Sequence, residues 1–302
     1  MSCLYFIIGP TAVGKSELSL RWAERHGAEI LYCDAFCVYR GMDIGTAKPD
    51  RSEQARVPHH GIDIVNVDTP YTVGAYVDYS RGVVEDCARR EVPLLISGGS
   101  GFYTRSFFAP VTDSTETTDE VRARVRSMGS EEALAELRRL NPDGIQGLDL
   151  LNPRRVQSAL ERCMASGKPL AVLQKEYREQ ELPYAAWDKR ICLLMRDREV
   201  LNSRIGERAR LMLQSGLVDE VRRLRGMGFE RNPSAASAIG YRETLAWLDS
   251  GESGGLEALA GEIAQNTRKL VKKQLAFFRN QLPPARVVDL DSGRPDLDKL
   301  FE

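Results

Sequence analysis

The 302-residue sequence lacks the features that mark several broad classes of protein. No stretch approaches the roughly 20 apolar residues of a membrane-spanning helix. The short apolar run at 4–8 reaches a glycine loop too early for a secretion signal. Internal repeats and low-complexity tracts are absent from the sequence as well. We therefore expect a globular protein of the cytoplasm, monomeric and not associated with a membrane.

The sequence also lacks paired cysteines and an excess of one charge. The six cysteines are scattered with no C-x-x-C pair, which argues against a zinc site and a disulfide framework and fits a reducing compartment. They are Cys3, Cys33, Cys37, Cys87, Cys163 and Cys192. With a net charge of −1 there is no global attraction to nucleic acid, so any RNA-binding surface must be a local basic patch.

What is present is an alternation of apolar runs and helical patterns. Strands are predicted at 4–8, 29–32, 62–65, 93–97, 190–195 and 287–290. Helices are predicted at 17–25, 73–89, 101–108, 198–214, 217–227, 237–248 and 256–281. This order predicts an α/β fold, a P-loop-type parallel sheet core with flanking helices.

The segment 119–181 interrupts this alternation with helical spacing and no strand candidate. It is preceded by 110–118, which is rich in Thr, Ser, Asp and Pro and is typical of a linker. We expect three parts: 1–118 as the first half of the core, 119–185 as an all-helical insertion domain, and 186–302 as the second, mostly helical half with a basic C-terminal helix.

The most specific motif follows the first predicted strand and precedes a helix. Its eight residues match G-x-x-x-x-G-K-[ST] without departure, namely Gly9, Pro10, Thr11, Ala12, Val13, Gly14, Lys15 and Ser16. Such a loop points successive N–H groups into one concavity at a helix N-terminus, which suits a polyphosphate. Lys15 adds a positive charge, and the Ser16 hydroxyl is a ligand for Mg²⁺. The motif predicts nucleotide or diphosphate binding but does not by itself specify ATP.

A second feature is Asp34, at the carboxyl end of the second predicted strand. In open α/β sheets this edge lines the ligand crevice, which would place Asp34 near the P-loop. A turn or helix-capping aspartate is the alternative from position alone. The run 39–49 (YRGMDIGTAKP) that follows is too irregular for an ordinary connector and is typical of a functional loop.

These segments together resemble the tRNA dimethylallyltransferases (IPP transferase family). The resemblance rests on GPTAVGKS, Asp34 and YRGMDIGTAKP, then on 97–103 (SGGSGFY), 119–124 (DEVRAR), 152–161 (NPRRVQSALE) and 239–243 (IGYRE). It extends from Gly9 to about Phe278. It implies transfer of a dimethylallyl group from dimethylallyl diphosphate to N6 of the adenosine 3′ of the anticodon, position 37 of tRNA, with release of pyrophosphate and with Mg²⁺ as cofactor.

The resemblance also implies roles for individual residues. Asp34 would be the general base, and Lys15, Arg208 and Ser100 would assist catalysis at the diphosphate or the adenine. Ser16 would hold Mg²⁺. The partners would be dimethylallyl diphosphate and the tRNA anticodon stem-loop. The expected tRNA-binding residues are Asp34, Ala35, Phe36, Cys37, Ser100, Arg122, Arg154, Arg155, Val156, Gln157, Ser158, Ser237, Ala238, Ile239, Gly240, Tyr241 and Arg242.

Charge patterning identifies a further surface for RNA. Residues 119–181 carry 11 basic and 11 acidic residues, so RNA binding there needs one face to concentrate the positive charges. The helix predicted near 262–281 has a clearer excess, with Arg268, Lys269, Lys272, Lys273 and Arg279. A solubilising face is the alternative interpretation of that helix.

The sequence departs from the family pattern at several positions. Ala35 and Cys37 replace the usual Ser and Gln after the catalytic Asp, Glu120 replaces a Pro, and Arg154 and Ser158 differ in the insertion motif. We expect these changes to affect tRNA contacts rather than the chemistry. His59 and His60 we expect to be hydrogen-bonded structural residues.

Three other functions remain open at this point. A P-loop kinase or ATPase would use the same loop, but the 39–49 run has no role in it. An adenylate isopentenyltransferase acting on free nucleotide would not need the helical insertion. An RNA-binding module with a vestigial loop is disfavoured by the intact Lys15, Ser16 and Asp34.

Overall fold

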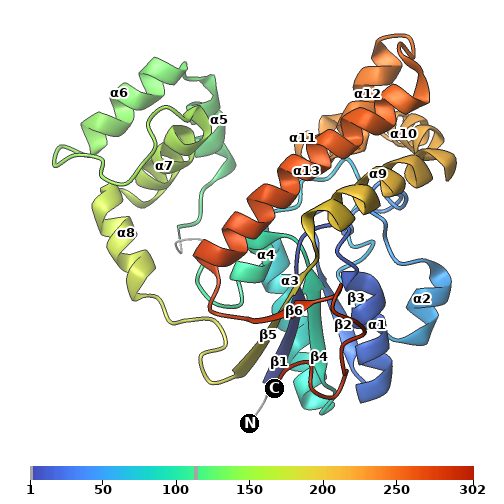
Figure 1. The fold of residues 1–302 in the computed structure, drawn as a ribbon. Coiled ribbons are helices and arrows are strands. Elements are labelled where there is room, and N and C mark those ends of the chain that lie inside the picture. The colour runs from blue at the N-terminus through green and yellow to red at the C-terminus, as the bar shows by residue number, and fades with distance from the viewer. Residues whose placement is uncertain (1–2, 112–114) are drawn as a thin grey trace. The chain divides into compact units, whose positions relative to one another are not determined.

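The computed structural model describes residues 3–111 and 115–302. A six-stranded sheet forms its centre, with strand order β3-β2-β4-β1-β5-β6 and every pair parallel (Figure 1). The strands are β1 (Cys3–Ile8), β2 (Glu29–Cys33), β3 (His59–His60), β4 (Leu94–Gly98), β5 (Asp188–Met195) and β6 (Arg286–Asp289). The predicted α/β fold with a parallel sheet is confirmed.

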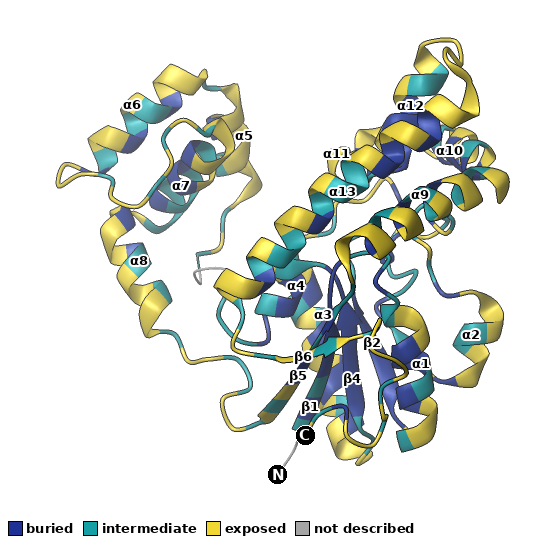
Figure 2. Cartoon of the chain, in the orientation of Figure 1, coloured by how far each residue is buried: buried dark blue, intermediate teal, exposed yellow. Residues whose placement is uncertain are grey.

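The inner strands explain why this sheet forms. β2 and β4 are buried along their whole length, and β1 is buried through its second half (Figure 2). Their continuous apolar runs suit strands that are covered by helices on both faces. β4 lies between β1 and β2, with Phe6 opposite Ile96 and Leu31 opposite Ile96 on the other side.

Helices from the segments before residue 109 and after residue 185 flank the sheet and extend beyond its carboxyl edge. They are α1 (Lys15–His26), α2 (Arg51–Arg56), α3 (Val73–Arg89), α4 (Gly101–Arg105), α9 (Arg198–Gln214), α10 (Leu217–Gly226), a 3₁₀ turn η1 (Phe229–Arg231), α11 (Pro233–Ala236), α12 (Tyr241–Asp249) and α13 (Gly255–Gln281). Several begin at capping side chains, as when Thr72 accepts a hydrogen bond from the Ala75 N–H at the start of α3. α13 packs along α9 (Figure 1).

Two element predictions were wrong in position. The third strand is β3 at 59–60, not 62–65, because Gly61 and Asp63 take left-handed conformations that turn the chain out of the sheet. Val65 makes only an isolated bridge to Tyr39. The helix predicted at 237–248 begins at Tyr241, since Gly240, with a φ of 95°, interrupts it.

The chain divides into two compact units, Met1–Phe108 with Ala186–Glu302, and Ala109–Ala185. The second unit contains α5 (Asp119–Ser127), α6 (Ser130–Leu140), α7 (Pro153–Ser166) and α8 (Leu170–Glu179), around a core of its own that includes Val125, Leu137, Leu160 and Leu173. Of the linker predicted at 110–118, residues 112–114 lie outside the described residues, and 110–111 and 115–118 fall in this second unit.

The parallel order brings the carboxyl ends of four strands to one edge of the sheet. The P-loop follows β1, Asp34 follows β2, Gly99 follows β4 and Arg196 follows β5. This is the edge at which open α/β sheets bind ligands. Across residues 3–111 and 115–302, no helix combines the length and the apolar content needed to cross a membrane.

Candidate active site

The P-loop lies between β1 and α1 and is held from both sides by cations. Inside the loop, the Lys15 ammonium donates to the carbonyls of Gly9 at 2.9 Å and Pro10 at 2.7 Å. Outside it, the Arg204 guanidinium donates to the carbonyl of Ala12 at 2.9 Å. Arg196 likewise donates to the carbonyl of Val13 at 2.8 Å. Because these cations bind the carbonyls of the loop, they stabilise it in the concave conformation that binds anions through backbone N–H groups.

Lys15 has an unusual acidity for a lysine. Burial of its ammonium and, to a smaller extent, the positive charge of Arg208 lower its pKa from 10.5 to about 7, while Asp34 opposes the shift. Burial also lowers the pKa of Arg208. Two partly buried cations therefore interact with one carboxylate beside the P-loop, an arrangement that a bound polyanion would stabilise.

Asp34 is held by the turn that follows β2. Its Oδ1 accepts the backbone N–H groups of Phe36 at 2.8 Å and Cys37 at 3.2 Å, the pattern of an Asx turn. No hydrogen bond to its Oδ2 is found among the described residues. One oxygen thus fixes the carboxylate, and the other is left to act on a ligand.

A buried carboxylate organises a second loop that lines the same cavity as Asp34. Glu220, in α10, accepts the backbone N–H groups of Asp43, Ile44 and Gly45 at 2.9–3.3 Å. It also accepts the Tyr241 hydroxyl at 2.6 Å. A Cβ at Gly45 would lie 2.4 Å from the Tyr241 ring, so only glycine allows this close approach.

The loop built on Glu220 reaches the cationic group. The carbonyl of Thr46, next to Gly45, accepts a hydrogen bond from Arg208 Nη2 at 3.4 Å. In the same loop, Lys48 donates to Asp43 and Asp63, each at 2.6 Å, and to the carbonyl of Tyr39 at 2.9 Å. The 39–49 run is therefore an ordered wall of the site, held at its middle by the buried carboxylate of Glu220 and joined end to end by the buried ammonium of Lys48.

Gln274 of α13 joins two of the strand-end loops. Its Oε1 accepts the Thr11 N–H of the P-loop at 3.0 Å, and its Nε2 donates to the carbonyl of Gly99 at 2.9 Å. A Cβ at Gly99 would come within 2.7 Å of that amide nitrogen. One side chain thus sets the distance between the P-loop and the loop after β4.

These loops enclose a cavity of about 460 Å³. Among the predicted site residues it is lined by Thr11, Asp34, Ala35, Phe36, Ser100, Arg208, Ser237, Ala238, Ile239, Tyr241 and Arg242. Of the predicted catalytic residues, Asp34, Ser100 and Arg208 therefore share one space. Of the eight predicted P-loop residues only Thr11 lines this space, and the Lys15 ammonium is bonded to the P-loop carbonyls instead. The inner wall of the cavity is apolar and buried, with Ile205, Ala209 and Ile263, whereas Arg242 and Lys273 are exposed at its opening.

Other predicted residues lie elsewhere. Cys37 and Gly240 are buried and do not line the cavity. Ser16 is exposed in the first turn of α1. In the helical unit, Arg122, Arg154, Arg155 and Ser158 are exposed and Gln157 is half-buried. The side chain of Val156 is buried in that unit's own core, so this residue supports α7 rather than its surface.

The sequence predictions missed Glu220 and Gln274 as site residues, although both hold loops that form the walls of the cavity. Glu220 lies within the predicted helix 217–227 as a charged residue of an otherwise amphipathic pattern. Gln274 lies in a basic helix, where a single amide carries no signal. A buried acid on the apolar side of α10 is the one indication that helical periodicity could have provided.

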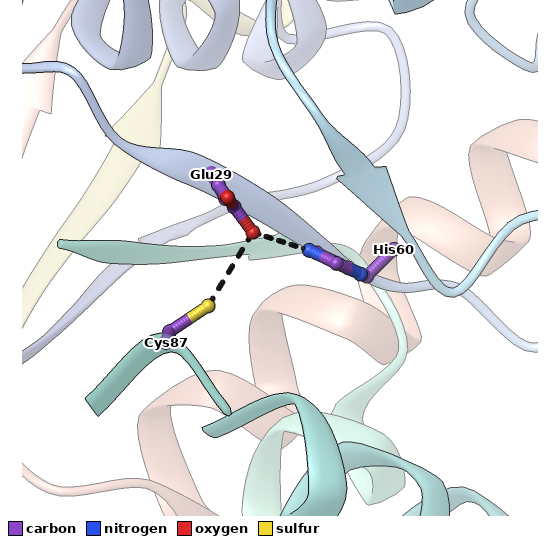
Figure 3. A group of neighbouring side chains, drawn as sticks. All are labelled: Glu29, His60 and Cys87. Atoms are coloured by element: carbon purple, nitrogen blue, oxygen red, sulfur yellow. Dashed lines mark hydrogen bonds and ion pairs between the residues drawn. The ribbon is translucent and has the colours of Figure 1, made fainter. Parts of the chain in front are cut away.

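A separate cluster bears on metal binding. Glu29, His60 and Cys87 offer ligand atoms within 4.8 Å of one another, at the end of β2 remote from the P-loop (Figure 3). The Arg90 guanidinium already pairs with both Glu29 oxygens, at 2.6 and 2.9 Å. This pairing lowers the pKa of Glu29 to about 2, and burial raises the pKa of the Cys87 thiol to about 12. With a resident cation and a protonated thiol, the cluster is an ion-pair network, and His60 is the hydrogen-bonded structural residue expected.

Comparison with known proteins gives a consistent result. The family described as IPP transferase matches residues 37–281, and that described as isopentenyl transferase matches residues 2–59. The tRNA dimethylallyltransferase of Opitutus terrae is 51% identical over 288 residues, which cover 95% of this chain and 92% of that protein.

Solved structures of other proteins share the fold. The full-length tRNA isopentenylpyrophosphate transferase of Bacillus halodurans is 29% identical, with a TM-score of 0.69, over 100% of this chain and 93% of that one. A eukaryotic dimethylallyltransferase captured acting on tRNA has a TM-score of 0.81 over 96% of this chain and 74% of that one; at 24% identity this likeness shows the fold alone. On the family match and the identity to its curated relatives, this chain belongs to the tRNA dimethylallyltransferase (IPP transferase) family.

Proposed function

We propose that the chain transfers a dimethylallyl group from dimethylallyl diphosphate to N6 of adenosine 37 in tRNA and releases pyrophosphate. The observation that carries the proposal is the single cavity shared by Thr11 of the P-loop, Asp34 and Arg208. The acceptor tRNA is supported by the names of the relatives, the first of which this chain matches over 92% of its length.

The P-loop side stabilises the leaving group. Adenine N6 is a poor nucleophile because its lone pair is delocalised into the ring, so the diphosphate must leave readily. Backbone N–H groups of the loop, the Lys15 ammonium at its base and the Arg208 guanidinium in the cavity would stabilise the charge that develops on the departing oxygen. A bound polyanion also raises the pKa of Lys15 and keeps this residue charged.

Mg²⁺ fits the residues at the mouth of the P-loop. The Ser16 hydroxyl is exposed in the first turn of α1, directly after Lys15. Mg²⁺ keeps several waters and takes few protein oxygens together with substrate phosphates, so one hydroxyl is a suitable donor set. When bound there, the ion would neutralise charge on the diphosphate.

Asp34 accepts the proton that the adenine loses. N6 attacks C1 of the dimethylallyl group, the C1–O bond breaks, and its electron pair leaves with pyrophosphate. The proton lost from N6 passes to Asp34 Oδ2, the carboxylate oxygen that the Asx turn leaves available. Ser100 lines the same cavity and would hydrogen-bond the adenine.

The apolar inner wall gives the prenyl chain its environment. Ile205, Ala209 and Ile263 are buried and line the cavity, with Met212 and Leu270 beside them. Cleavage of an allylic diphosphate leaves cationic character on carbon, which water would trap. A lining without polar groups on this side excludes that water.

The tRNA requires cations outside the cavity. Arg242 and Lys273 lie exposed at its opening, and α13 continues with Arg268, Lys269 and Lys272. We assign these cations, with Arg122 and the exposed residues of the 154–158 segment in the helical unit, to the phosphates of the anticodon stem-loop. Because its substrate is tRNA, we place the enzyme in the cytoplasm.

The proposal is tested by mass spectrometry of nucleosides from unmodified tRNA after incubation with the protein, dimethylallyl diphosphate and Mg²⁺. The expected result is one N6-dimethylallyl-adenosine per tRNA, absent when the adenosine at position 37 is replaced by guanosine. Parallel reactions offer AMP in place of tRNA, or ATP in place of the diphosphate. Product from AMP alone would favour an adenylate isopentenyltransferase, and ATP turnover alone would favour a kinase or ATPase.

A further inference from the structure

Phe102 is an aromatic side chain that the reaction described above does not use. It lies in α4, lines the cavity and is 60% exposed. A residue that both lines a cavity and faces solvent is at its opening. Single exposed apolar side chains are common on protein surfaces, so its neighbours must decide whether this one has a role.

The Phe102 ring packs against another aromatic side chain, which fixes its position. Phe277 of α13 meets it edge to face, with ring centroids 5.2 Å apart and an interplanar angle of 63°. Phe277 in turn lies on the backbone of Gly101, where a Cβ would come within 2.4 Å of its ring. α4 and α13 pack side by side at this point (Figure 1). The pair therefore presents one fixed aromatic face to solvent.

The opening around this face is positively charged. Arg242 and Lys273 line the same cavity and are exposed. An aromatic surface bordered by cations suits a nucleotide, whose base stacks and whose phosphate pairs with the charges. The same surface suits the prenyl chain poorly, because the enclosed apolar wall lies deeper, at Ile205, Ala209 and Ile263.

We infer that Phe102, supported by Phe277, is a stacking platform for the nucleobase next to the adenine that enters the cavity. This inference rests on the proposed function. An adenine that leaves its stack to reach Asp34 deprives its neighbouring base of a stacking partner. The Phe102 face at the opening replaces that partner and lowers the cost of extruding the adenine. Phe102 is thus a residue for RNA recognition, outside the chemistry at Asp34.

Steady-state kinetics on an anticodon stem-loop RNA test the assignment. For Phe102→Ala we expect the RNA KM to rise about tenfold, within the range for loss of one base–aromatic stack, with the KM for dimethylallyl diphosphate changed less than twofold. Phe102→Leu keeps apolar bulk without an aromatic face and should lose nearly as much. Phe102→Trp should restore the RNA KM. Leu256→Ala, at an exposed apolar position at the start of the same α13, is the matched control and should leave both KM values unchanged.

A spectroscopic measurement separates stacking from simple contact. 2-Aminopurine is placed on the 5′ or the 3′ side of the target adenosine, and its fluorescence is read in complexes with the wild-type protein and with Phe102→Leu. We expect stronger quenching by the wild type at one of these positions. The inference is overturned if, at each of the two positions, the wild type and Phe102→Leu give equal fluorescence. It is also overturned if Phe102→Ala raises only the KM for dimethylallyl diphosphate. In both cases tRNA prenylation stands. Absence of prenylation by the wild-type protein would instead refute the proposed function.

Discussion

Asp34 holds its position with one carboxylate oxygen and leaves the other for chemistry. Because Oδ1 alone accepts the Phe36 and Cys37 N–H groups, an amide at this position can keep the turn while losing the base. We expect Asp34→Asn to bind both substrates within a few-fold of wild type and to lose about 10²–10⁴ in single-turnover rate. A normal single-turnover rate in this variant would remove Asp34 from the base role.

Lys15 offers a pH-dependent test of the diphosphate site. In the free protein its pKa is held near 7 by burial and by Arg208, so at pH 8 Lys15 is neutral in most of the molecules. Diphosphate oxygens favour the charged form and raise this pKa, so binding at pH 8 should take up nearly one proton. Calorimetric titration in two buffers of different ionisation enthalpy measures this uptake.

The same linkage fixes the pH trend of affinity. Above pH 7 the free protein must gain a proton to bind, so affinity for dimethylallyl diphosphate should fall as pH rises from 7 toward 10, by up to tenfold per unit. Lys15→Met should bind more weakly, with no proton uptake. A binding heat that does not depend on the buffer in the wild type would contradict the shifted pKa.

At the scale of elements, α10 supports the 39–49 loop through one buried carboxylate. Removing it in Glu220→Ala leaves three backbone N–H groups and the Tyr241 hydroxyl without their acceptor. We expect a loss of about 2–4 kcal/mol in the free energy of unfolding, measured by urea denaturation, together with reduced turnover as the loop and Arg208 shift.

Tyr241→Phe is the matched comparison, since it removes one donor from the same carboxylate and leaves the backbone bonds in place. It should cost about 1 kcal/mol. If the two variants were equally stable, the backbone contacts of Glu220 would not be what holds the loop.

How far the sequence predicts these elements depends on the range of the contacts. The P-loop and Asp34 are predictable because each directly follows an apolar strand, and parallel strands share one carboxyl edge. Gln274 and Thr11 are 263 positions apart, and Glu220 and Ile44 are 176 apart. No local pattern pairs such residues. The third strand was misplaced for a local reason, since left-handed Gly61 and Asp63 give no hydropathy signal.

At the scale of the whole molecule, the two units have separate hydrophobic cores. Leu160→Ala leaves a cavity in the core of the helical unit and should destabilise that unit by about 2–5 kcal/mol. Scanning calorimetry should show one unfolding transition moved to lower temperature, while binding of dimethylallyl diphosphate by the other unit persists.

Leu95→Ala, in the central strand β4, should move the other transition instead. Affinity for the anticodon stem-loop should fall in Leu160→Ala if the helical unit grips RNA as proposed. A single transition that both substitutions shift equally would mean that the units unfold together.

The last helix of the chain has a consequence for how the protein tolerates damage. α13 contributes Gln274, which ties two loops, and Phe277, which underlies the opening, although the proposed reactive groups all precede residue 209. A premature stop codon anywhere between 255 and 273 would thus keep every proposed reactive group. It would still abolish activity, because Gln274 and Phe277 would be lost. Gene fragments that retain the P-loop and Asp34 are accordingly poor evidence of a working copy.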